Sequence, residues 1–146
     1  MMNTTATADN WHWDLKRYLK EHFYTEESVL DDIYQTIKKE FENDYRINIG
    51  NPTFSDQVDN KIEFQLSFDD HTDKPQIPNI RQIIARAIYY YFGQNRDYLL
   101  EGNSDMKIRT SMDYLLSSIY NTYMMFDLLY FPIDKSETEY DIIVNL

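Results

Sequence analysis

The sequence predicts a single α+β domain, with helices packed on one face of a small, mainly antiparallel sheet. Its length of 146 residues suits one compact domain with a real core. Four stretches repeat apolar residues at helical spacing, and three stretches alternate apolar and polar residues as half-buried strands do. The expected order is α-α-β-β-α-α-β over residues 1–146, with a flexible N-terminus over residues 1–9.

Two amphipathic helices are expected at the start of the chain. The first spans about residues 10–22, with Trp11, Leu15 and Leu19 on one face. The second begins after Thr25, a residue type that caps helix N-termini, and ends near residues 42–43. Its apolar stripe predicts the following buried side chains: Val29, Leu30, Ile33, Tyr34, Ile37 and Phe41.

Three strands are expected, because the apolar period changes there from about 3.6 to 2. Residues 45–49 and 61–69 both alternate, and residues 139–146 form a last strand that joins the same sheet. The connection over residues 51–60 is long for a hairpin loop, which leaves room for a short extra strand or a bulge. The clearest alternation predicts one buried row: Ile62, Phe64, Leu66 and Phe68.

Two further helices are expected between the second and third strands. The first covers about residues 79–92, and Gly93 suits the position just after a helix. Residues 94–103 form a linker or a short helical turn. The second runs from about residue 104 to residue 130, because its apolar residues keep helical spacing, and Pro132 stops it.

The composition narrows the function. The formal net charge is −11 at pH 7, so nucleic acid and anionic membranes would repel the protein. The chain contains no cysteine, which excludes disulfides, thiolate zinc sites and cysteine nucleophiles. The first residues lack the pattern of a secretory signal, and no apolar stretch is long enough to span a bilayer. We therefore expect a cytoplasmic protein whose partner is a basic protein.

The negative charge is concentrated in one block of the chain. Residues 26–73 hold thirteen acidic and four basic side chains, a net charge of −9. We interpret this block as a functional acidic surface that attracts a basic partner; the alternative is a solvated face that only aids solubility. The carboxylates expected to bind the partner are Glu27, Asp31, Asp32, Glu42, Asp44, Asp56, Asp59, Glu63, Asp69, Asp70 and Asp73.

Two tyrosines are added to this set of partner-binding residues. In the third helix, Tyr91 and Phe92 face inward, whereas Tyr89 and Tyr90 lean outward beside Arg86. Tyrosines beside carboxylates are typical anchors of protein interfaces. The alternative is that the tyrosines fill a crowded seam between two helices.

Residues 69–73 are the strongest candidate for a metal site. Asp69, Asp70 and Asp73 offer the ligands that Mg²⁺, Mn²⁺ or Ca²⁺ prefers, and His71 would suit a softer metal. The spacing does not match a calcium-binding loop, and aspartates after a strand commonly form turns. We therefore expect a polar loop with no metal and no cofactor, and a metal-dependent hydrolase is the alternative from another class.

Other catalytic patterns do not occur in the sequence. A restriction-type nuclease site needs Glu-x-Lys on a strand, and Gln65 stands where the lysine is required after Glu63. His12 and His22 are too far apart on the first helix to share a metal. No nucleophile elbow, phosphate-binding loop or dinucleotide fingerprint occurs. We expect a protein that is not an enzyme.

Size, charge and missing chemistry together favour an inhibitor. Carboxylates spaced over a helix and strands can imitate a phosphate backbone and so block the nucleic-acid-binding surface of another protein. This character is typical of phage or mobile-element proteins that block defence nucleases, such as anti-CRISPR and anti-restriction proteins. The open alternatives are an immunity protein or antitoxin that neutralises a basic toxin, and an assembly subunit that oligomerises through the Tyr- and Met-rich fourth helix.

Overall fold

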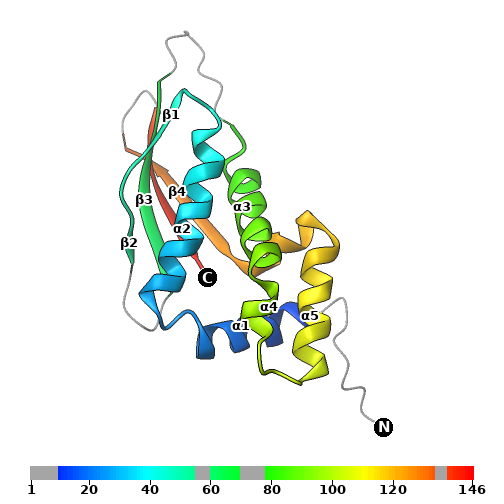
Figure 1. Ribbon diagram of the computed structural model, residues 1–146. Coiled ribbons are helices and arrows are strands. Elements are labelled where there is room, and N and C mark those ends of the chain that lie inside the picture. The colour runs from blue at the N-terminus through cyan, green and yellow to red at the C-terminus, as the bar shows by residue number, and fades with distance from the viewer. Residues whose placement is uncertain (1–9, 55–59, 70–77, 134–137) are drawn as a thin grey trace.

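The fold, taken from a computed structural model, is an open five-stranded antiparallel sheet with helices on one face (Figure 1). The structure describes residues 10–54, 60–69, 78–133 and 138–146. The expected α+β class, with helices packed on one face of a small antiparallel sheet, is therefore confirmed. The flexible segment expected over residues 1–9 lies outside the described residues.

The first half of the chain follows the sequence pattern closely. Helix α1 covers Trp11–His22 and helix α2 covers Glu27–Glu42, and the predicted apolar stripes of both are buried. The prediction that Thr25 caps α2 is wrong, because Glu26 occupies the N-cap position and makes no side-chain cap hydrogen bond. Strands β1 (Ile47–Ile49), β2 (Thr53–Phe54) and β3 (Lys61–Phe68) follow, so the extra strand allowed for in the connection is present.

Helix α3 covers Ile80–Gln94 and the short helix α4 covers Arg96–Leu100. The Asn79 side chain caps α3 by accepting a hydrogen bond from the backbone N–H of Gln82 at 3.0 Å. The expected end at Gly93 is wrong, since the helix continues through this glycine. The C-cap is Asn95, whose backbone N–H and side-chain amide both donate to the Tyr91 carbonyl.

The long fourth helix expected over residues 104–130 is replaced by three elements. They are helix α5 (Met106–Ser117), the 3₁₀ helix η1 (Ile119–Met125) and strand β4 (Asp127–Pro132). The break comes at Ser118, which has an extended backbone and accepts a hydrogen bond from the Tyr120 N–H at 3.2 Å. A serine that bonds its neighbouring backbone competes with the helical ladder. Pro132 therefore ends a strand and not a helix.

Strand β5 (Glu139–Asn145) completes the sheet, whose order is β1-β3-β5-β4. Strand β2 also pairs with β3, beyond the point where β1 leaves it. The register places Ile142 opposite Phe64, and both side chains point to the helices and are buried. The rings of Tyr34 and Phe41, on α2, meet Phe64 edge to face, with centroids 5.6 and 6.4 Å away. The core thus lies between this side of the sheet and the α2–α3 layer.

No helix in the described part of the chain is long and apolar enough to cross a membrane.

Candidate functional site

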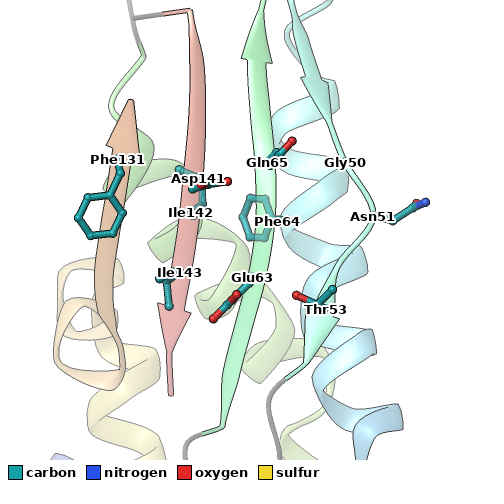
Figure 2. Close-up of a pocket in the computed structure, with 10 residues that line it drawn as sticks. All are labelled: Gly50, Asn51, Thr53, Glu63, Phe64, Gln65, Phe131, Asp141, Ile142 and Ile143. Atoms are coloured by element: carbon teal, nitrogen blue, oxygen red, sulfur yellow. The ribbon is translucent and has the colours of Figure 1, made fainter. Parts of the chain in front are cut away.

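The side of the sheet that faces away from α2 and α3 carries exposed carboxylates beside exposed apolar side chains. Alternation along each strand sends every second side chain to this side, because the other set is buried in the core. Figure 2 looks onto it, with the helices behind the strands. We call it the open sheet face, and its principal side chains are Lys61, Glu63, Gln65, Asp127, Leu129, Phe131, Glu139, Asp141 and Ile143.

The register arranges these side chains in rows across the strands. Thr53, Glu63, Ile143 and Leu129 lie opposite one another in sequence across β2, β3, β5 and β4. Gln65, Asp141 and Phe131 form the next row. Both of these rows run from polar or acidic side chains on β3 or β5 to an apolar side chain on the edge strand β4, whereas the row of Lys61, Asn145 and Asp127 ends at a carboxylate.

The centre of the open sheet face is a shallow cavity of about 380 Å³. Figure 2 shows Asp141 leaning from β5 towards β3, and Glu63 leaning from β3 towards β5. Both side chains belong to exposed residues. Two carboxylates thus flank the same hollow, where an approaching cation would meet both.

Acidic side chains outnumber basic ones on this face. Glu63, Asp127, Glu139 and Asp141 are exposed, whereas Lys61 is the one basic side chain that the described strands place among them. Opposite charge on a partner is the natural complement of such a surface, because complementary potentials speed encounter and set the docking register.

The apolar side chains lie along one margin of the open sheet face. Leu129 and Phe131 of β4 are 53% and 51% exposed. Large exposed apolar side chains beside polar ones mark protein-interaction surfaces more often than isolated ones do. The open sheet face therefore presents exposed carboxylates beside exposed apolar side chains.

The acidic residues predicted on α2 lie in the helical layer, on the side of the sheet opposite the open face. Glu27, Asp32 and Glu42 are exposed and Asp31 is half-buried. Lys38 lies 3.8 Å from the Glu42 carboxylate in a surface pair. The structure thus separates the predicted set into two surfaces, with Glu63 on one and the α2 carboxylates on the other.

Asp44 is held by its neighbour Arg46. The Asp44 carboxylate accepts hydrogen bonds from the Arg46 guanidinium at 3.0 and 2.7 Å and from its backbone N–H at 3.0 Å. These hydrogen bonds, the side-chain ones above all, lower the pKa of Asp44 to about 2. Asp44 is thereby a local turn partner whose charge Arg46 largely offsets.

The two predicted tyrosines have different surroundings. Tyr89 is half-buried, and its hydroxyl donates to the Leu116 carbonyl at 3.1 Å, which ties α3 to α5. This geometry matches the helix-seam alternative for Tyr89. Tyr90 is 57% exposed, on the same side of α3 as Arg86. Tyr90 is thus the one of the pair that is open to a partner.

The remaining predicted residues lie partly outside the described chain. Asp69 is exposed just after β3. Asp56, Asp59, Asp70, His71 and Asp73 lie outside the described residues, and the three-aspartate metal site depends on two of them. Within the described ranges, no group of three or more histidine or carboxylate side chains is placed to hold a metal ion.

Sequence reasoning missed the side chains that β4 and β5 supply. Asp127, Leu129 and Phe131 fell in the expected fourth helix, so their strand alternation was hidden. Glu139 and Asp141 were placed on the last strand, and their alternation with Tyr140 and Ile142 was the signal that they share one face.

Fold and surface together define a class, an α+β domain with an acidic sheet face that no described helix covers. Comparison of the chain with protein-family models, curated proteins and solved structures found no significant match.

Proposed function

We propose that this protein is a non-enzymatic binding protein that docks the open sheet face onto a basic surface of another protein. One observation carries the proposal: the exposed carboxylates of β3, β4 and β5 lie beside the exposed apolar side chains of β4. Charge would attract the partner, and Leu129 and Phe131 would supply the desolvated contacts that hold it.

The partner that best suits this surface is a nucleic-acid-binding enzyme. Such enzymes carry dense arginine and lysine surfaces that normally bind phosphates. Carboxylates repeat along β5 at Glu139 and Asp141, and residues two apart on a strand are separated by roughly 7 Å. A row of this kind can occupy cationic side chains that otherwise bind a phosphate backbone. The specific form of the proposal is an inhibitor of a defence nuclease, of the anti-CRISPR or anti-restriction type.

The test uses a panel of purified RNA-guided nucleases and restriction enzymes, with labelled DNA binding measured by fluorescence anisotropy. The protein should displace DNA from at least one member, and less well as salt is raised. The double variant Glu63→Lys/Asp141→Lys should lose at least about tenfold in inhibitory potency. Purified basic ribonuclease toxins form a second panel, and inhibition confined to them would favour an immunity protein.

A matched control changes the same charge on the other surface. Glu27→Lys/Asp32→Lys alters two exposed carboxylates of α2 and should keep full potency. If the α2 variant loses potency and the sheet variant keeps it, the docking surface is the helical layer. Absence of inhibition or binding across both panels would contradict the proposed function.

A further inference from the structure

A groove of about 630 Å³ runs along α1 and has a different character from the acidic surfaces. Helix α1 supplies His12, Trp13, Lys16, Arg17, Lys20 and Glu21 to its wall, and Met124 of η1 and Asp127 of β4 line it as well. The volume is within the range of small-molecule sites, roughly 300–1,000 Å³. We call it the α1 groove.

The α1 groove holds two lysines, Lys16 and Lys20, together with the carboxylates of Glu21 and Asp127. Lys16 and Lys20 are one helical turn apart on the same side of α1, so their ammonium groups repel each other. Neither makes a salt bridge with a described residue, whereas neighbouring Arg17 is bound to Asp14 at 2.5 Å. Burial lowers the pKa of Lys16, Lys20 lowers it further, and Asp127 opposes both effects. An anion between the two lysines would relieve this repulsion.

The same groove presents a planar aromatic surface. Trp13 is 69% exposed, although Trp11, two residues earlier, is 2% exposed. The centroids of the Trp13 and His12 rings are 5.4 Å apart. Met124, which also lines the groove, is 45% exposed. Burial and the nearby Lys16 lower the pKa of His12, which leaves its ring uncharged at neutral pH. A flat ligand that stacks on the indole would bury surface of the Trp13 ring that is otherwise exposed to water.

We propose that the α1 groove binds a nucleoside monophosphate, with the base stacked on Trp13 and the phosphate between Lys16 and Lys20. A phosphate carries nearly two negative charges at neutral pH, which matches two ammonium groups, and lysine is a common phosphate ligand. A base stacks on indole without needing sequence-specific contacts. The free nucleotide is the ligand and not a nucleic-acid chain, because the net charge of −11 repels a polyanion.

This site is separable from the proposed docking function, because Trp13, Lys16 and Lys20 lie on α1 and only Asp127 belongs to both surfaces. The variant Glu63→Lys/Asp141→Lys should therefore leave nucleotide binding unchanged. Failure of one proposal thus does not entail failure of the other.

The test is calorimetric titration of the full chain with AMP, adenosine and inorganic phosphate. AMP should bind, and adenosine and phosphate should each bind at least about tenfold more weakly, since each lacks one half of the ligand. Trp13→Ala and Lys16→Gln/Lys20→Gln should each weaken AMP binding by at least about tenfold. Lys38→Gln/Lys39→Gln removes the same charge from α2 and should leave AMP affinity unchanged.

Several results would overturn the proposal. They are no heat of AMP binding at millimolar concentration, equal affinity for AMP and inorganic phosphate, or unchanged affinity in the Lys16/Lys20 variant. Tighter binding of a single-stranded oligonucleotide than of AMP would also overturn it, because the site would then serve a polymer. The substituted lysines and Trp13 are at least partly exposed, and circular dichroism confirms that each variant is folded.

Discussion

Two tyrosines of the helical layer, Tyr24 and Tyr18, differ in whether the hydroxyl group is hydrogen-bonded, and this difference affects the free energy of unfolding. Tyr24 is buried, and its hydroxyl has no hydrogen-bond partner among the described residues. Burial, with a smaller contribution from Tyr91, raises the pKa of Tyr24. In contrast, the Tyr18 hydroxyl donates to the Leu99 carbonyl at 2.6 Å. A buried polar group without a partner costs free energy that a satisfied one does not.

The two tyrosines therefore predict opposite effects of the same substitution. Tyr24→Phe should leave the free energy of unfolding unchanged or raise it by about 1 kcal/mol, because it removes an unsatisfied hydroxyl. Tyr18→Phe should lower it by roughly 1–2 kcal/mol, because the carbonyl of buried Leu99 loses its donor. Urea unfolding followed by circular dichroism measures both, and a larger loss for Tyr24→Phe than for Tyr18→Phe would contradict this account.

Among the elements, β4 is an edge strand of the sheet, and several of its large apolar side chains are exposed. The Ile133 N–H donates to the Glu139 carbonyl at 2.8 Å, so alternate residues of β4 direct their backbone groups to β5. Leu128, Tyr130 and Pro132 consequently direct theirs to the free edge. Proline has no N–H to offer there, which removes one donor that a second strand would need. Pro132 thus limits edge-to-edge pairing.

Pro132→Val should increase self-association, because it restores the donor beside the exposed side chains of Leu129, Tyr130 and Phe131. Sedimentation velocity at several concentrations measures the change relative to the unaltered protein. Pro132→Lys restores the same donor but adds a charge that opposes pairing, and should not increase self-association. Unchanged self-association of Pro132→Val would show that Pro132 has no such role.

Element prediction from the sequence worked where the pattern is local. Helices α1 to α3 and strands β3 and β5 follow from their own apolar spacing. The segment from Ile119 to Tyr130 is expected to be helical because Ile119, Tyr123 and Phe126 also keep that spacing. Its actual structure depends on pairing with β5, a contact between segments that local spacing does not report.

For the whole molecule, the sequence predicted an excess of negative charge but not its distribution in space. The acidic block of residues 26–73 contributes Glu63 to the open sheet face. It contributes Glu27 to the exposed surface of α2, on the opposite side of the sheet. The open face also takes Asp127, Glu139 and Asp141 from outside that block, through the β3–β5–β4 pairing. Of the four exposed carboxylates on the open sheet face, the partner-binding set expected from the sequence therefore contains only Glu63.

Charge on both sides of a small domain predicts a response to salt. The net charge of −11 opposes compaction, and salt screens this repulsion over about 10 Å at 0.1 M. The melting temperature should rise by a few degrees between about 20 and 300 mM NaCl, and equally in KCl. Glu63→Lys/Asp141→Lys makes the charge less negative and should reduce the increase. A melting temperature that falls with NaCl would contradict self-repulsion.

The place of β5 in the sheet has a consequence for the order of folding. β5 lies between β3 and β4 in the sheet, but it follows both of them in the sequence. Three α-helices, η1 and β4 separate β5 from its partner β3 along the chain. The loop that closes on forming the β3–β5 pair is therefore long, and long-range pairing slows folding. Until residues 139–145 have paired with β3, β4 has no neighbouring strand in the described sheet. The edge of β3 that pairs with β5 is also unpaired until then. Before β5 is in place, β3 and β4 thus present unpaired backbone N–H and C=O groups, which are a template for pairing with another chain.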